Sequence, residues 1–232
     1  MQFELVSLKE DFSIDPRDYI GINKNIFIAN PNAPTGLILT TSDIEEIVKS
    51  NPNNIVVVDE AYIDFGGKSA VPLVREYDNL VVTQTFSKSR SMAGARLGFG
   101  IACPALINDL YRLIYSTNPY NISRASMAAG IGAVEDYEYT KANCQKIIET
   151  RKRFSDALTS LGFEVLPSSA NFVFAKSEDI GGRELYESLK EEGILIRHFD
   201  KPRINNYVRI TIGLESDMDI LLEKIKLILD KQ

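Results

Sequence analysis

The sequence predicts an α/β fold in which a large domain with a mostly parallel sheet precedes a small α+β C-terminal domain. Short apolar runs, among them Ile26–Ala29, Ile55–Val58 and Asn79–Thr83, alternate with loops or helical patterns. A fully apolar run such as Ile55–Val58 is typical of a strand covered on both faces, and alternation with helices favours parallel pairing. After Gly162 the spacing changes to short strands and two helices, which indicates a second unit.

The elements of the first unit follow in order. Phe3–Leu8 is predicted as a strand, and Asp11–Tyr19 as a loop because of Pro16. After the turn-rich segment 30–36, Thr41 or Ser42 is expected to cap a helix that buries one apolar face. Pro104 starts a helix that runs to about Ser116. The remaining expectations are a burial face formed by Ile44, Ile47 and Val48, and a further strand at Leu97–Ala102.

A long helical pattern leads into the second unit. It runs from Ile122 to about Leu161, with an interruption near Asp136–Tyr139, after the helix-breaking segment Asn118–Asn121. The predicted domains are the large domain at 1–135, a connecting long helix at 136–161 and the small domain at 162–232. The small domain is expected to contain strands at Gly162–Leu166, Ala170–Ala175, Ile194–Arg197 and Tyr207–Ile212, with helices at Gly182–Glu192 and Asp217–Leu229.

Composition narrows the class of protein. The chain has 232 residues, 44% hydrophobic and 25% charged, with a net charge of −6, which favours neither nucleic acid nor an anionic membrane as partner. Cys103 and Cys144 form no CxxC pair and His198 is the only histidine, so no metal or disulfide framework is expected. No signal peptide or membrane-spanning run is seen. A cytoplasmic enzyme or binding protein is therefore expected.

One lysine, one acid and one phenol stand just after the ends of two apolar runs. Lys88 follows Asn79–Thr83. Asp59 follows three valines, so it is expected at the buried end of an apolar strand, and it precedes Tyr62. In a parallel sheet, ligands bind beyond the carboxyl ends of the strands. A lysine that condenses with an aldehyde must lose its proton, which burial and neighbouring cations favour. A surface lysine is the commoner role of an isolated Ser-Lys pair, and a helix or turn cap is the alternative for Asp59.

Other side chains can donate hydrogen bonds to a phosphate or a carboxylate. Thr85, Ser87 and Arg96 provide two hydroxyls and a bidentate fork close to the lysine. Arg197 and Arg209 lie at or within apolar runs, where a guanidinium is costly without an anion. A salt bridge to a local acid is the alternative for each of the two arginines. A substrate with a carboxylate and a phosphate-like group would employ both.

Several segments resemble fold-type I pyridoxal-phosphate aminotransferases of the class II subgroup, and they are most similar to the histidinol-phosphate aminotransferases. The resemblance spans nearly the whole chain from about Phe3. It rests on Asn30–Gly36, Asp59–Tyr62, Thr85–Arg96, Asn118–Asn121, Ser169–Phe172, Gly193–Arg197 and Tyr207–Gly213.

The resemblance implies a role for each candidate residue. Lys88 would form the Schiff base with pyridoxal 5'-phosphate, Asp59 would hold the pyridine nitrogen, and Tyr62 would contact the ring hydroxyl. The cofactor phosphate would be bound by Thr85, Ser87 and Arg96. The implied substrate residues are Arg209 for the α-carboxylate, Arg197 for the distal phosphate, and Tyr120, Asn121 and Asn171 along the pocket.

Two features depart from the pattern of the family. Ala33 stands where family members usually have an asparagine that bonds the cofactor ring, with Asn32 adjacent. An N-terminal portion with a phosphate-binding turn, a stacking aromatic residue and an arm to the partner subunit is expected to be missing before Met1. Weakened activity and poor cofactor binding by the chain alone are therefore expected. An incomplete sheet would leave an unpaired edge and an exposed apolar face, so the chain is expected either to dimerise tightly or to be metastable.

The implied reaction moves an amino group between histidinol phosphate and 2-oxoglutarate or glutamate, as in histidine biosynthesis. The partners are a phosphorylated, amino-acid-like small molecule, a 2-oxo acid and a second copy of the chain in a homodimer, with no nucleic acid and no membrane. Two alternatives remain open. One is a decarboxylase that uses pyridoxal phosphate and acts on threonine phosphate; the other is an inactive folded fragment.

Overall fold

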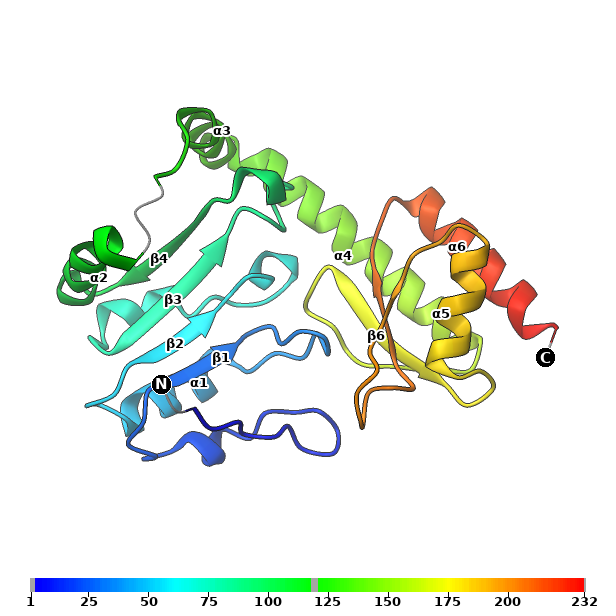
Figure 1. Ribbon diagram of the computed structural model, residues 1–232, viewed down its shortest axis with the longest axis horizontal. Coiled ribbons are helices and arrows are strands. Elements are labelled where there is room, and N and C mark those ends of the chain that lie inside the picture. The colour runs from blue at the N-terminus through cyan, green and yellow to red at the C-terminus, as the bar shows by residue number, and fades with distance from the viewer. Residues whose placement is uncertain (1–2, 118–120, 232) are drawn as a thin grey trace.

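Two four-stranded sheets lie on either side of a long helix, α4 (Tyr137–Ser160), in the computed structural model, which describes residues 3–117 and 121–231 (Figure 1). The first sheet consists of β1 (Ile26–Ala29), β2 (Val56–Asp59), β3 (Leu80–Thr85) and β4 (Gly98–Ala102), in that order. β1, β2 and β3 pair in parallel, and β4 is antiparallel to β3. The prediction of an α/β fold with a mostly parallel sheet is confirmed.

Helix α1 (Thr41–Ser50) covers one face of this sheet. Its buried Ile44, Ile47 and Val48 pack with the inward residues of β1, β2 and β3, as the helical spacing predicts. The predicted cap at Thr41 or Ser42 is wrong by one residue, because Thr40 is the N-cap. Thr40 Oγ1 accepts from the Asp43 amide, and Asp43 Oδ2 accepts from the Thr40 amide.

The opposite face of the sheet is only partly covered. The side chain of Phe27 is 78% exposed, although Ile26 and Ile28 beside it are buried. Val57 of β2 shares the face of Phe27 and is half-buried. The prediction that Ile55–Val58 is covered on both faces is therefore wrong for the face opposite α1. Asp59 projects from this same open face, because alternate strand residues share a face.

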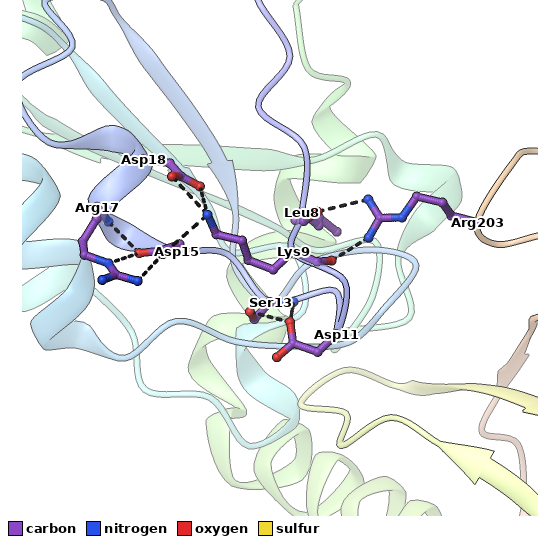
Figure 2. Close-up of polar contacts among 8 residues, drawn as sticks. All are labelled: Leu8, Lys9, Asp11, Ser13, Asp15, Arg17, Asp18 and Arg203. Atoms are coloured by element: carbon purple, nitrogen blue, oxygen red, sulfur yellow. Dashed lines mark hydrogen bonds and ion pairs between the residues drawn. The ribbon is translucent and has the colours of Figure 1, made fainter.

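The first segment of the chain is irregular. The strand predicted at Phe3–Leu8 is wrong, because these residues pair with no strand and Phe3 is 83% exposed. A 3-10 helix, η1 (Pro16–Tyr19), occupies the end of the expected loop. Figure 2 shows the ties of the segment: Arg203 donates to the carbonyls of Leu8 (3.0 Å) and Lys9 (2.5 Å), and Lys9 Nζ contacts the carboxylates of two aspartates. The two acids are Asp15 (3.5 Å) and Asp18 (2.9 Å).

Helices α2 (Pro104–Thr117), α3 (Arg124–Glu135) and α4 follow β4. The predicted interruption near Asp136–Tyr139 is confirmed, since Asp136 ends α3 and caps α4 through a bond from the Tyr139 amide to its carboxylate (3.3 Å). No helix in the described ranges combines the length and apolar character that a bilayer crossing needs.

The second sheet is antiparallel throughout. Its order is β5 (Phe163–Val165), β6 (Phe172–Ser177), β8 (Val208–Thr211) and β7 (Arg197–His198), and α5 (Gly182–Glu191) and α6 (Glu215–Leu229) pack on it. The strand predicted at Ile194–Arg197 is shorter and begins only at Arg197, because residues 194–196 pair with no strand. The domain boundaries at 135 and 161 stay a prediction.

Candidate active site

A cleft of about 340 Å³ lies between the two halves of the molecule. The arrows of β1 and β2 point toward the second sheet, so the carboxyl ends of these strands meet the N-terminal end of β6 (Figure 1). The lining residues from the first half are Tyr62, Ser87, Lys88, Ser91 and Ala93, and those from the second half are Asn171, Phe172, Arg209 and Thr211.

Asp59 is the last residue of β2, beside Thr83 of the parallel strand β3. Its Oδ1 accepts from the Ala61 amide (3.1 Å) and from Thr83 Oγ1 (3.4 Å). Its Oδ2 makes no hydrogen bond to the residues described. The expectation that Asp59 is buried is wrong, because it projects from the open face of the sheet and is exposed. A carboxylate oxygen is thus free at the carboxyl end of the sheet.

Lys88 lies in the turn after β3, at the same edge of the sheet as Asp59, because β2 and β3 are parallel neighbours. Its Nζ is 5.4 Å from the centre of the Tyr62 ring. No carboxylate among residues 3–117 and 121–231 forms an ion pair with Lys88. The expected burial of the lysine is wrong, since its side chain is exposed. An unpaired amine on the face of a phenol is accessible to a small electrophile.

The predicted phosphate donors separate into two groups. Thr85 Oγ1 donates to Ser87 Oγ (2.9 Å) and accepts from the Ser87 amide (3.1 Å), so the two hydroxyls lie together at the end of β3. Arg96 has a left-handed backbone (φ 52°), and its Nη1 donates to the Ala93 carbonyl (3.2 Å). Arg96 is exposed and does not line the cleft.

Arg209 is held by aromatic rings, with no acid paired to it in the described part of the chain. Its Cζ lies 5.1 Å from the centre of the Phe172 ring and 5.8 Å from that of Phe199. Its Nε is buried and has no hydrogen-bond partner. Arg197 lies opposite Arg209 on β7, with its Cζ 5.4 Å from the Phe199 ring. A half-buried guanidinium with an unused donor is suited to an anionic ligand.

The two halves of the cleft meet through aromatic contacts. Tyr62 and Phe172 touch edge to face, with centroids 5.1 Å apart. Lys88 lies over Tyr62 and Arg209 over Phe172, so a continuous series of ring contacts connects the amine to the guanidinium. The cleft therefore carries one positive charge on each side of an aromatic junction.

Asn32 and Asn121, like Arg96, do not line the cleft. Asn32 is engaged within its own turn, where its Oδ1 accepts from Thr35 Oγ1 (2.9 Å). Asn121 is exposed and does not line the cleft. Tyr120 lies outside the described residues.

Sequence reasoning missed some residues that shape the cleft. Thr211 lines it because strand residues two apart share a face, a spacing from Arg209 that was visible in the sequence.

Glu60, next to Asp59, is buried; it accepts from Ser69 Oγ (2.6 Å), the Ala70 amide (2.6 Å) and Gln84 Nε2 (2.8 Å). Burial raises the pKa of the Glu60 carboxyl, and these hydrogen bonds oppose the shift. Only the fold distinguishes this structural acid from its exposed neighbour.

The edge-lying lysine, the free carboxylate and the unpaired arginine occur on a fold that belongs to a known class. The chain belongs to the aminotransferase class I and II family, whose model matches residues 1–225.

Similar proteins narrow the comparison. The chain is 52% identical to a histidinol-phosphate aminotransferase of Brachyspira hyodysenteriae over 97% of its own length and 64% of that protein's. The structure superposes on the histidinol-phosphate aminotransferase of Clostridium acetobutylicum with a TM-score of 0.87, at 30% identity, covering 97% of this chain and 70% of the other. The enzyme of the same description from Sinorhizobium meliloti, solved with pyridoxal-5'-phosphate, gives a TM-score of 0.79 at 26% identity, over 89% of this chain and 57% of that one.

Proposed function

We propose that the chain carries the histidinol-phosphate aminotransferase reaction, in which an amino group passes between histidinol phosphate and 2-oxoglutarate or glutamate. The observation that carries this proposal is the pair of uncompensated cations in one cleft, Lys88 on the first half and Arg209 on the second. The names of the similar proteins support the choice of substrate.

The residues present fit pyridoxal 5'-phosphate as the cofactor. Lys88 offers an amine with no acid bound to it, and Asp59 keeps Oδ2 free at the neighbouring strand end. Thr85 and Ser87 would hold the phosphate through their hydroxyls, with Arg96 nearby in the sequence. When bound, the cofactor supplies an aldehyde that condenses with amines and a ring that takes up electrons.

Each residue would then have a defined task. The Asp59 carboxylate would hold a proton on the ring nitrogen, and the Tyr62 hydroxyl would donate to the ring oxygen. The Lys88 Nζ would take the proton from the substrate carbon that bears the amino group. Asn171 would line the substrate pocket, and the resemblance gives Asn121 and Tyr120 the same role.

The arginines would orient the substrate. Arg209 would bind the carboxylate of the 2-oxo acid, because its buried Nε has no other partner. Arg197, exposed on the neighbouring strand, would bind the second carboxylate or the phosphate of histidinol phosphate. One pair of guanidiniums can thus accept both substrates in turn.

Product analysis tests the proposal. The chain is mixed with pyridoxal phosphate, histidinol phosphate and 2-oxoglutarate, and glutamate formation is followed. The proposal predicts glutamate in amounts equal to the histidinol phosphate consumed. A second mixture contains threonine phosphate in place of histidinol phosphate. Release of carbon dioxide from it, without glutamate, would instead favour the decarboxylase. A folded chain that does neither would favour the inactive fragment.

Assembly and location belong to the same proposal. A homodimer would cover apolar side chains that α3 exposes, Met127, Ile131 and Val134 among them. Soluble substrates of amino-acid metabolism would place the enzyme in the cytoplasm. Sedimentation of the purified chain across a range of concentrations distinguishes the dimer from the monomer.

A further inference from the structure

Arg151 of α4 forms hydrogen bonds to both halves of the molecule that border the cleft. Its Nη1 donates to the carbonyl of Phe65 (2.9 Å) and to the carbonyl of Ala170, which belong to segments far apart in the sequence. Phe65 ends the 3-10 turn η2 (Ile63–Phe65), which begins directly after Tyr62. Ala170 immediately precedes Asn171 and Phe172. One side chain therefore touches the backbone beside cleft residues of both halves.

The charge of Arg151 has no acid partner in the described ranges of the chain. Burial lowers the pKa of its guanidinium, and two carbonyl oxygens supply the compensation for its charge. Neighbouring Arg153 on the same helix behaves differently, since it is exposed and pairs with Asp219 (2.5 Å). A half-buried cation whose hydrogen bonds go to two backbone carbonyls depends on the positions of both.

The two halves of the cleft also meet at a contact between aromatic rings, and this contact depends on the distance between the halves. Tyr62 and Phe172 are in edge-to-face contact there, with Lys88 over the Tyr62 ring and Arg209 over the Phe172 ring. A second link, from the Ser169 amide to the Gly36 carbonyl (2.8 Å), holds the same loop to the turn before α1. Of these two links, the one through Arg151 reaches the turn that follows Tyr62.

We infer that Arg151 is a positioning residue that sets the separation of Lys88 and Arg209 by tying the turn after Tyr62 to the loop before Phe172. This inference rests on the proposed function for the identity of the anion, while the tie itself concerns the chain alone. Loss of Arg151 lets the two segments move apart. In the chain without cofactor, a dicarboxylate that places one carboxylate at the arginine pair Arg197 and Arg209 and the other at the free Lys88 amine then binds more weakly. The fold persists because the sheets keep their own cores.

The test compares Arg151→Ala with Arg153→Ala, a neighbouring arginine on the same helix, in chains without added cofactor. Titration with glutarate, a dicarboxylate that cannot react, measures the affinity of the cleft. Arg151→Ala is expected to bind glutarate about tenfold more weakly, the scale of a small displacement of binding groups. Millimolar guanidinium chloride is expected to restore the affinity, whereas sodium chloride at the same concentration is not. Arg153→Ala is expected to match the wild type.

Hydrogen exchange gives a second measurement that does not depend on the anion. Amides of residues 62–67 and 168–173 are expected to exchange faster together in Arg151→Ala and to keep wild-type rates in Arg153→Ala. Unchanged exchange in both segments, unchanged glutarate affinity, or an equal effect of Arg153→Ala would overturn the inference. If Arg151→Ala does not fold, Arg151→Lys takes its place, with a smaller effect in the same direction. If the wild-type chain does not bind glutarate, the proposed substrate is contradicted. The hydrogen-exchange rates then still test the role of Arg151.

Discussion

Arg197 and Arg209 face each other across the paired strands β7 and β8, and both guanidiniums approach the same ring, that of Phe199. Like charges directly opposite each other on a sheet are unfavourable. Neither arginine forms an ion pair within the part of the chain that the structure describes. The arrangement becomes favourable when an anion lies between the two, as the proposed substrates provide.

Replacing Arg197 by glutamine should reveal this repulsion. In low-salt buffer without added anion, the melting temperature of Arg197→Gln is expected to equal or slightly exceed that of the wild type. Added glutarate is expected to raise the melting temperature of the wild type more than that of the variant. Arg183→Gln is the control, because Arg183 is an exposed arginine of the same region that already pairs with Asp200 (2.9 Å). A variant that is less stable without anion and equally responsive to it would contradict the account.

Two variants of Tyr62 separate the contribution of its hydroxyl to cofactor binding from that of its ring. Tyr62→Phe removes the hydroxyl but keeps the ring against Phe172 and under Lys88. Cofactor affinity is expected to fall about threefold to tenfold, the effect of one hydrogen bond. Tyr62→Ala also loses the ring contacts and is expected to weaken binding further. Equilibrium titration with pyridoxal phosphate measures both, and equal affinities in Tyr62→Phe and the wild type would exclude a bond from the hydroxyl.

Ala33 is the position where the sequence departs from its family. Asn32 Oδ1 accepts a hydrogen bond from Thr35 Oγ1, which ties the Asn32 side chain to its own turn. Ala33→Asn is therefore expected to bind pyridoxal phosphate about threefold to tenfold more tightly, again the effect of one hydrogen bond. Asn32→Ala, the comparison variant, is expected to lack this gain. If Ala33→Asn leaves cofactor affinity unchanged, the departure has no consequence.

Glu60 makes stability depend on pH in a defined direction. Burial raises the pKa of its carboxyl above the ordinary value of 4.5, so the folded state binds the proton more tightly than the unfolded state. The contribution of Glu60 to the free energy of unfolding therefore decreases as pH rises from about 4.5 toward the raised pKa. In Glu60→Gln this decrease is absent. The free energy of unfolding of the variant therefore rises relative to that of the wild type as the pH increases over this range.

Denaturant unfolding at several pH values between about 4 and 7 checks this direction. Glu46→Gln, which removes an exposed carboxylate elsewhere, controls for the change in net charge. A difference between Glu60→Gln and the wild type that moves against the variant with rising pH would contradict the assignment.

The sequence was sufficient for the elements that depend on local pattern. The three valines of β2 and the run before Thr85 predict neighbouring parallel strands, and this brings Asp59 and Lys88 to one edge. Phe3–Leu8 has a strand-like composition but pairs with no strand, and a strand needs a partner. The helix cap was misplaced because residues 40–42 all carry hydroxyls, and the acid at Asp43 selects Thr40.

Side-chain environments were harder to predict than positions. The apolar run before Asp59 predicts a buried carboxylate, and the chemistry of an imine-forming amine predicts burial of Lys88. Both side chains are exposed, because coverage depends on what packs above the strand ends. Arg151 gave one usable signal, since its helical position falls on the face of the buried residues Cys144, Phe154 and Leu158. Its two carbonyl partners come from tertiary structure, and no spacing in the sequence indicates them.

The most direct test of the account asks which amine takes up pyridoxal phosphate. The chain is incubated with the cofactor, reduced with borohydride and digested, and the modified peptide is identified by mass. The account predicts the label on Lys88, because its amine is unpaired at the cleft, and predicts its loss in Lys88→Ala with the fold retained. A folded chain that takes up no label, or carries it on another lysine, would contradict the account.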